Sequence, residues 1–276
     1  MLKTNGRLCY RASPAECHQC FPDIGSGMFF LRKRMFLEAL QLAHTLISPS
    51  RFLADRISQW SGGVLDIQVL ENPRDRSAYE PPHAAEPLSH ETPHVGFFGQ
   101  INPFKGVHVL LRAFGILKQR HVAVRLRLFG ANLDIQEPEF KSAIEAQLVE
   151  LGDIVEFFGP YRNESVIRLM QTCAAVVIPS IWWENSPVVI QEARDAGVPI
   201  VGSRLGGIEE KLAGYDQAFL AEPGSPHALA DAIERALKDG AERSACGGPL
   251  LPSESVELGQ LRAVYDRALQ AAGKTQ

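Results

Sequence analysis

The chain has 276 residues, which is enough for one large domain or two small ones. Its formal net charge of -4 argues against a general nucleic-acid binder, because such proteins carry a basic excess. No apolar run approaches the ~18 residues that span a membrane, and residues 1–11 lack the apolar centre of a secretory signal. We therefore expect a cytoplasmic protein with no nucleic-acid partner; contact with the inner face of the membrane is an alternative.

The amino-terminal third contains two features that point to specific chemistry. Residues 32–34 are basic and follow the apolar residues 29–31, a combination that suits either an anionic membrane surface or, as we favour, a solvated helix face. Cys17 and Cys20 have the C-x-x-C spacing of a zinc site, with Cys9 upstream, but no second pair follows at a suitable distance. We expect free thiols, keep a structural zinc site as the minor alternative, and assign the three cysteines no role.

The composition changes after residue 72. Four prolines lie between residues 73 and 87, among few large apolar side chains, and such a stretch cannot build a core. Residues 73–93 are therefore predicted to be a linker. It separates an amino-terminal segment, residues 1–72, from a larger region.

Beyond the linker, apolar strand patterns alternate with helical patterns. We predict strands at residues 94–98, 124–129, 154–158, 174–178, 198–202 and 218–221. Helices are expected at residues 107–117, around 144–148, at 166–170, at 187–197, from 226 to about 240 and at 253–272. Continuous apolar strands that alternate with helices predict a parallel sheet covered on both faces, so the expected fold class is a doubly wound α/β domain.

This fold predicts where a ligand binds. In an open α/β sheet the ligand lies outside the carboxyl ends of the strands. Polar or glycine-rich stretches follow three of the predicted strands, at residues 100–106, 182–185 and 203–209. We therefore expect these loops to meet at one edge of the sheet and to form a nucleotide site.

Glu184 and Glu192 stand on either side of a predicted helix start, with Ser186 as the N-cap and Pro187 as the first helical residue. A helix N-terminus favours anionic or polyhydroxyl ligands, and a carboxylate accepts two hydroxyls at once, which suits a ribose diol. The alternative is a pair of solvated helix charges. By itself this spacing is common by chance.

Further motifs surround the two glutamates. The chain reads FGQ at 98–100, PFKGV at 103–107, VEFFG at 155–159, PS at 179–180, ENSP at 184–187, QEA at 191–193, GVPIV at 197–201 and GGIEE at 206–210. In this order and spacing the motifs resemble the group 1 (family four) glycosyltransferases, which are retaining enzymes of GT-B fold. The resemblance covers roughly residues 94–238.

The resemblance implies a role for each motif. Glu192 would hold the ribose hydroxyls of a nucleoside diphosphate sugar, Glu184 would lie beside the transferred sugar, and Lys105 would neutralise the departing diphosphate. The other donor-binding positions that it implies are Gly99, Gln100, Asn185, Ser186, Pro187, Gly206 and Gly207. The family implies no metal and no cofactor, since the nucleotide sugar is a co-substrate.

One position departs from the family pattern. The family has arginine after the glycine of its first donor loop, where this chain has Gln100. Glutamine donates hydrogen bonds without charge, so the diphosphate clamp loses a cation. Arg204, in another loop, is a candidate replacement. Trp182 and Trp183 precede Glu184 and suit either stacking on a sugar or burial, and we favour burial for at least one of them.

The resemblance also divides the chain. Residues 1–72 look like the last part of an acceptor-side domain, with a strand and helix start at 44–53 and a final strand at 67–71. Residues 94–245 would be the donor-binding domain, and residues 246–276 a linker and a helix that packs back on the acceptor side. The rest of the acceptor-side domain is expected to be missing. The leading hypothesis is transfer of a sugar to a glycan or lipid-linked acceptor. The alternative is a catalytically impaired donor-binding module completed by a partner chain or by self-association.

Overall fold

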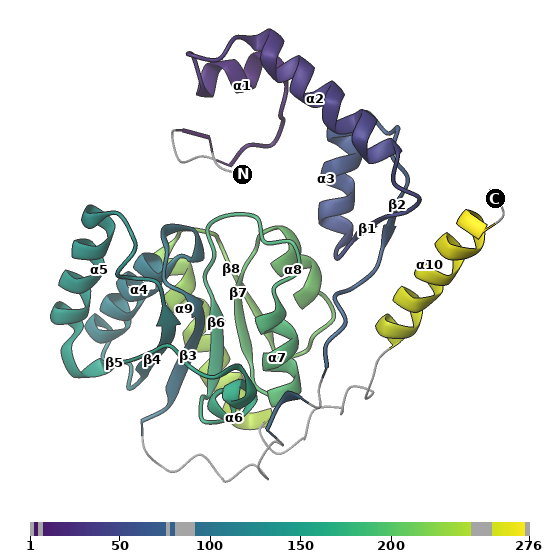
Figure 1. The fold of residues 1–276 in the computed structure, drawn as a ribbon. Coiled ribbons are helices and arrows are strands. Elements are labelled where there is room, and N and C mark those ends of the chain that lie inside the picture. The colour runs from purple at the N-terminus through teal and green to yellow at the C-terminus, as the bar shows by residue number, and fades with distance from the viewer. Residues whose placement is uncertain (1–2, 5–7, 76–77, 81–91, 244–255, 274–276) are drawn as a thin grey trace. The chain divides into compact units, whose positions relative to one another are not determined.

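The structure is a computed structural model that describes residues 3–4, 8–75, 78–80, 92–243 and 256–273 (Figure 1). The chain forms two compact units: Met1–Arg74 together with Glu254–Gln276, and Asp75–Ser253. The predicted division at residues 72–73 lies close to the first boundary. The predicted division at residues 245–246 lies outside the described residues.

The larger unit is built on a six-stranded parallel sheet with the strand order β5-β4-β3-β6-β7-β8. The strands are β3 (His94–Gln100), β4 (Arg125–Ala131), β5 (Val155–Gly159), β6 (Ala175–Ile178), β7 (Ile200–Ser203) and β8 (Ala218–Ala221). The predicted doubly wound parallel sheet is confirmed, and the strand ends lie within two residues of the prediction. Counted along this unit, the order is 3-2-1-4-5-6, which reverses direction between β3 and β6.

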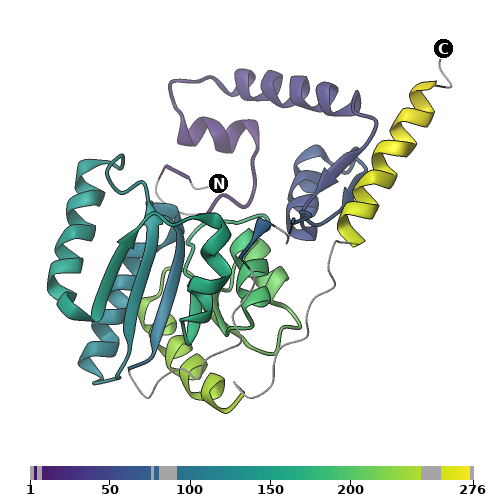
Figure 2. The same cartoon turned by 60° about the horizontal axis from the view of Figure 1, so that its bottom comes forward.

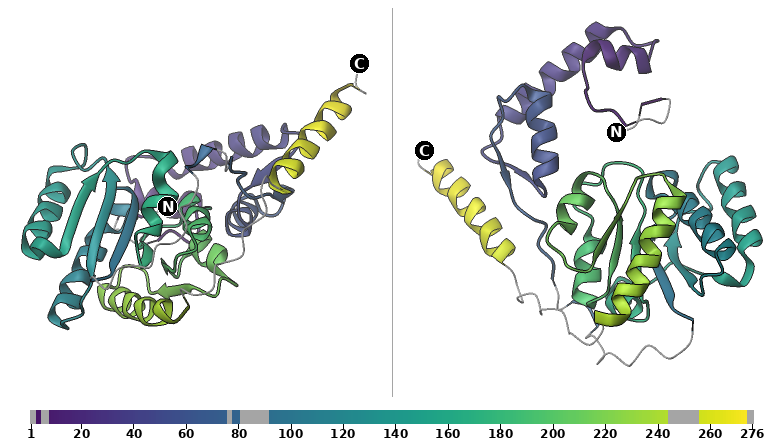
Figure 3. Two further views of the ribbon diagram at one scale, coloured as in Figure 1. Left: turned by 90° about the horizontal axis from the view of Figure 1, so that it is seen from below. Right: turned by 180° about the vertical axis from the view of Figure 1, so that it is seen from behind.

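Helices cover both faces of this sheet (Figure 2). In the view from behind, the yellow-green helix α9 lies along one face (Figure 3). One face carries α4 (Val107–Gln119), α5 (Pro138–Leu151) and α9 (Pro226–Arg243). The other face carries α6 (Val166–Gln171), α7 (Val188–Ala196) and α8 (Gly206–Leu212). All four residues of β6 are buried, as expected for a strand between two helical layers, whereas the edge strand β5 exposes Phe157 and Phe158.

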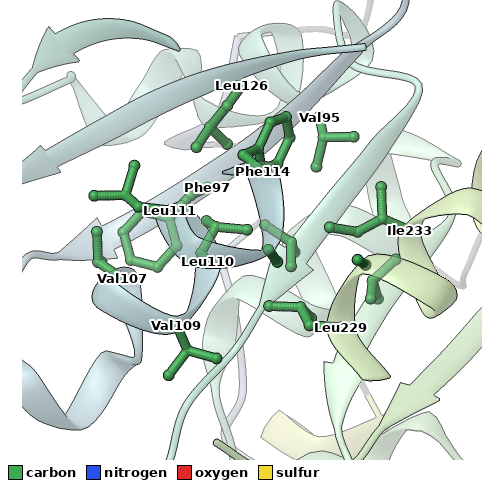
Figure 4. Close-up of a cluster of buried hydrophobic side chains, with 14 of the residues drawn as sticks. Val95, Phe97, Val107, Val109, Leu110, Leu111, Phe114, Leu126, Leu229 and Ile233 are labelled. Atoms are coloured by element: carbon green, nitrogen blue, oxygen red, sulfur yellow. The ribbon is translucent and has the colours of Figure 1, made fainter. Parts of the chain in front are cut away.

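The core on the α4 side shows how the apolar pattern determines the packing (Figure 4). The helix predicted at residues 107–117 is confirmed, and its apolar side chains at helical spacing are almost completely buried: Val107, Leu110, Leu111, Phe114 and Leu117. They pack in one cluster with Val95 and Phe97, which point to the same face because side chains alternate along β3. Burial of each large apolar side chain contributes up to about 1.5–3 kcal/mol.

Two helix starts differ from the sequence prediction. The helix α7 begins at Val188, and Pro187 is its N-cap with an extended ψ of 120°, so the prediction of Ser186 as N-cap was wrong by one residue. The backbone stays extended through Pro187, which lengthens the loop by one residue. The short helix α8 was not predicted, because it opens with Gly206 and Gly207, and glycine has a poor helix propensity.

The smaller unit contains a parallel pair of strands, β1 (Leu46–Ser48) and β2 (Ile67–Val69), joined through α3 (Arg51–Ser61). The strand, helix start and final strand that the resemblance implied are therefore present, and Ser50 caps α3 by accepting a hydrogen bond from the Leu53 amide at 3.2 Å. The remaining helices of this unit are α1 (Pro14–Cys20), α2 (Ser26–Gln41) and α10 (Val256–Gly273). In α10, Val264 is buried, whereas Tyr265 and Leu269 are exposed.

The helix α2 carries the basic residues 32–34 and buries none of its side chains. Arg32 and Arg34 are exposed, as a solvated helix face requires. The same helix also exposes large apolar side chains, namely Met28, Phe30, Leu31, Met35 and Phe36. Among the described residues, no helix combines the length and apolar character needed to cross a membrane.

Candidate functional site

The loop after β3 holds Lys105 in place through its own hydrogen bonds. The Asn102 side chain accepts from the amides of Phe104 and Lys105, both at 3.0 Å, and so caps the 3-10 turn Pro103–Lys105. Gly106 follows with φ 73° and leads directly into α4. Lys105 therefore sits on a fixed turn at the amino-terminal end of a buried helix.

This loop packs backbone against backbone on the loop that follows β6. The Ile181 amide donates to the Phe104 carbonyl at 2.9 Å. A Cβ added to Gly106 would lie well under 3.0 Å from the Pro179 carbonyl oxygen. Only glycine combines the positive φ with this close approach. The two loops that flank the reversal point of the sheet are thus locked together.

Lys105 and Glu184 meet across these two loops. The Lys105 ammonium donates to Glu184 Oε1 at 2.7 Å, and the same oxygen accepts from the Ser180 hydroxyl and the Trp182 indole N–H, each at 3.0 Å. The exposed fraction of the side chain is 11% for Glu184 and 30% for Lys105. Three donors on one oxygen restrict the rotation of the carboxylate.

Trp182 has two functions in this arrangement. Its ring stacks on Phe104 with the ring centroids 5.0 Å apart, while its indole N–H reaches Glu184. Trp182 and Trp183 are both half-buried. Packing and hydrogen bonding therefore coexist at Trp182. The sequence argument weighed stacking on a sugar against burial and did not consider a hydrogen bond to Glu184.

A third loop joins the site at α8. The Gly207 amide donates to the Glu184 carbonyl at 2.9 Å, and a Cβ on Gly207 would lie well under 3.0 Å from the Asn185 carbonyl oxygen. The loop after β6 therefore contacts both the loop after β3 and the start of α8 after β7, so the three loops meet as the fold argument predicted. They bring Lys105, Glu184 and Gly207 together.

Glu192 lies in the second turn of α7, the helix that follows the loop carrying Glu184. Its exposed fraction is only 5%, and its Oε1 accepts a hydrogen bond from the Tyr79 hydroxyl at 3.2 Å. Burial, followed by the nearby charges of Glu192 and Tyr79, raises the pKa of Tyr161 to about 12. The interpretation of both glutamates as solvated helix charges is wrong, because both are enclosed and hydrogen-bonded.

The remaining predicted positions line the same edge of the sheet. Gln100 ends β3 and is exposed, with a long 3.5 Å contact from the Asn102 amide group to its side-chain oxygen. Arg204 follows β7, exposes its side chain and donates its backbone N–H to the Ala221 carbonyl. The other predicted positions occupy the β3 terminus, the β6–α7 loop and the start of α8: Gly99, Asn185, Ser186, Pro187 and Gly206.

The cysteines are not assembled into a metal site in the described part of the chain. Cys9, Cys17 and Cys20 are half-buried free thiols, and Cys173 is a buried free thiol. Within the described residues, no three His, Cys, Asp or Glu side chains form a group that could hold a metal ion. Burial, followed by the neighbouring Cys9 and Cys20, raises the pKa of Cys17. A raised pKa makes the Cys17 thiol a poorer metal ligand, because the ligand is the thiolate.

A model of the family described as "Glycosyl transferases group 1" matches residues 80–248 of the chain. The chain belongs to the group 1 glycosyltransferases. In this glycosyltransferase chain the match falls entirely within the larger unit, Asp75–Ser253, which holds Lys105, Glu184 and Glu192. The resemblance predicted from the motifs is confirmed.

Known relatives agree with this family. The D-inositol 3-phosphate glycosyltransferase of Corynebacterium glutamicum (strain R) is 28% identical over 222 residues, which cover 78% of this chain and 52% of the relative. The glycosyltransferase chain thus spans about half the length of the curated relatives it matches.

Solved structures show the same fold. Sucrose-phosphate synthase from Thermosynechococcus elongatus has a TM-score of 0.70 at 23% identity, with 87% of this chain and 62% of that chain covered. Anabaena Alr3699/HepE, solved in complex with UDP-glucose, has a TM-score of 0.63 at 25% identity, with 76% of this chain and 58% of that chain covered. The fold of the glycosyltransferase chain is GT-B-like.

Tyr79 is the residue at this site that sequence reasoning missed. It lies inside the predicted linker, residues 73–93, yet the structure places its hydroxyl on Glu192. A single aromatic residue among prolines carries no periodic signal. Its position 113 residues before Glu192 gives no local indication of the contact.

Proposed function

We propose that the larger unit binds a nucleoside diphosphate sugar and is the donor lobe of a retaining transferase that moves a hexose to a glycan or lipid-linked acceptor. The observation that carries the proposal is the Lys105–Glu184 pair, 2.7 Å apart, on the loops that follow β3 and β6. The strand order reverses between these two strands, and α/β sheets of this order bind ligands at that point.

Lys105 supplies charge where the reaction needs it. As the bond between sugar and diphosphate breaks, negative charge develops on the departing phosphate and positive charge on the sugar. An ammonium has three donors, of which one reaches Glu184, so two can reach phosphate oxygens. The N-terminus of α4 begins next to Lys105, and its unpaired amides favour the same anion. Lys105 therefore stabilises the leaving group.

Glu184 faces the sugar in this arrangement. Among the described residues its three hydrogen-bond donors all reach Oε1, which leaves Oε2 to accept a sugar hydroxyl. The fixed carboxylate would orient the sugar, because its three bonds restrict its rotation before any ligand arrives. Positioning of this kind accounts for much of the rate of a bimolecular transfer.

Glu192 is the proposed ribose-binding residue. Its carboxylate is buried in α7, so a vicinal diol that donates to both oxygens would replace lost hydration. UDP is the first nucleotide to test, because the Anabaena relative was solved with UDP-glucose. We also propose that transfer requires no metal cofactor. Equal initial rates with and without EDTA would support that part of the proposal.

Calorimetric titration of the whole chain with UDP, GDP, ADP and UDP-glucose tests the proposal. We expect saturable binding of one nucleotide and its glucose conjugate. Glu192→Gln keeps the volume of the side chain but loses its charge, and should weaken binding by about tenfold, the loss of one charge-assisted hydrogen bond.

Glu150→Gln is the matched control, because Glu150 is exposed at the end of α5 and should leave the affinity unchanged. A folded chain that binds none of these ligands would refute the donor-lobe proposal. Binding without transfer to any acceptor would instead indicate a donor-binding module that another chain completes.

A further inference from the structure

A short segment near the start of the larger unit, residues 78–80, is bonded to the rest of that unit. The Glu80 amide donates to the Glu164 carbonyl at 2.8 Å, and the Arg168 guanidinium donates to Glu80 Oε2, also at 2.8 Å. Tyr79, the preceding residue, packs its ring against the apolar cluster beneath α6 and α7. A backbone hydrogen bond, an ion pair and a partly buried ring thus hold residues 78–80 in place.

This anchoring places the Tyr79 hydroxyl on Glu192 Oε1 at 3.2 Å. Tyr161 lies near the same carboxylate, and its raised pKa keeps its hydroxyl neutral across the physiological range. Glu192 has little contact with solvent, so its orientation depends on the groups around it. The Tyr79 hydroxyl donates one of these orienting bonds.

We infer that Tyr79 is a positioning residue that orients the Glu192 carboxylate for the ribose hydroxyls of the donor; this rests on the proposed function of Glu192. A carboxylate oxygen has two acceptor positions, so Oε1 can accept from Tyr79 and from one ribose hydroxyl together. Oε2 can accept the second hydroxyl. A glutamate whose torsions are already restricted loses less conformational freedom when the nucleotide binds.

The inference predicts a signature that loss of packing alone would not produce. Tyr79→Phe keeps the ring and removes only the hydroxyl. If the hydroxyl orients Glu192, the affinity for UDP should fall by about tenfold in this variant. The affinity for 2′-deoxy-UDP should fall by less, because this nucleotide offers one hydroxyl fewer to the carboxylate. The affinity ratio of UDP to 2′-deoxy-UDP should therefore shrink in the variant.

Tyr215→Phe is the matched control. Tyr215 is half-buried, packs against the same apolar cluster and donates its hydroxyl to the Val198 carbonyl, at a site away from Glu192. The Tyr215→Phe variant should leave the ratio of UDP affinity to 2′-deoxy-UDP affinity unchanged. Arg168→Ala is a second variant: it removes the ion pair to Glu80 at a partly exposed position and should shrink the ratio while Tyr79 stays intact.

Calorimetric titration of the whole chain and these three variants with UDP and 2′-deoxy-UDP, or with the GDP pair if guanine is selected, decides the question. A smaller ratio in Tyr79→Phe and Arg168→Ala, with wild-type values in Tyr215→Phe, supports the inference. Wild-type discrimination that persists in Tyr79→Phe overturns it but leaves the proposed function intact. A wild-type chain that does not discriminate between the two nucleotides refutes the ribose role of Glu192 itself, and the inference with it.

Discussion

Replacing Gly106 by alanine tests whether the two loops at the reversal point of the sheet must touch for the site to exist. The added methyl group would meet the backbone carbonyl of Pro179 well inside 3.0 Å, whereas ordinary contact begins at about 3.4 Å. No rotamer change can relieve this clash, because the obstacle is backbone. The loops must separate, and Lys105 must move away from Glu184.

The magnitude follows from a matched pair of glycines. Gly106 has φ 73° and ψ 21°, and Gly197, at the end of α7, has φ 70° and ψ 25°. Alanine in this left-handed conformation costs about 1–2 kcal/mol at either position. Only Gly106 adds a clash, since nothing lies within 4 Å of a Cβ at Gly197. Overpacking costs about 1–3 kcal/mol. Gly106→Ala should therefore lower the free energy of unfolding by about 1–3 kcal/mol more than Gly197→Ala does.

Urea unfolding of both variants measures this difference in the free energy of unfolding, and UDP titration measures the effect on the site. We expect Gly106→Ala to weaken UDP binding by about tenfold, because one charge-assisted contact is misplaced. Gly197→Ala should bind nearly as wild type. Equal losses of stability and of affinity in the two variants would show that the contact between the loops contributes nothing.

Two further predictions concern Lys105 and Cys173. Lys105→Ala should lower the transfer rate by at least about 10²-fold while changing the free energy of unfolding by less than about 1 kcal/mol. Initial rates and urea unfolding measure the two quantities. A transfer rate near that of wild type would show that Lys105 has no role in the chemistry. Burial raises the pKa of Cys173 to about 12 from an ordinary value of 9.0. Between these values the unfolded chain binds fewer protons than the native one, so this thiol should lower stability by about 1.4 kcal/mol per pH unit as pH rises. Cys173→Ala should lack that component in urea unfolding at pH 8, 10 and 11, and an unchanged slope would contradict the assignment.

The sheet and the meeting of the three loops could be predicted because both follow from periodic burial. Strands covered on both faces need continuous apolar runs, and β6 is such a run. Once the strands alternate with helices, their carboxyl ends must share an edge. Lys105 and Glu184 are 79 residues apart in the chain, yet this rule is sufficient to bring their loops together.

The hydrogen bonds within the site could not be predicted. The convergence of Ser180, Trp182 and Lys105 on one oxygen of Glu184 depends on how two loops fold, and loops carry no periodic pattern. The position of Tyr79 depends on an ion pair between Glu80 and Arg168, which are 88 residues apart. Contacts of this kind are set by tertiary structure.

The replacement of a family arginine by Gln100 changes how the charge at this site is distributed. Gln100 is exposed and neutral, so Lys105 is the cation that the structure places directly against Glu184. In the proposed function, two of the three ammonium donors of Lys105 would reach phosphate oxygens while the third stays on Glu184. The bonds from Ser180 and Trp182 hold Glu184 independently of Lys105. In the proposed function, these two bonds would keep the carboxylate oriented toward the sugar while Lys105 stabilises the leaving group.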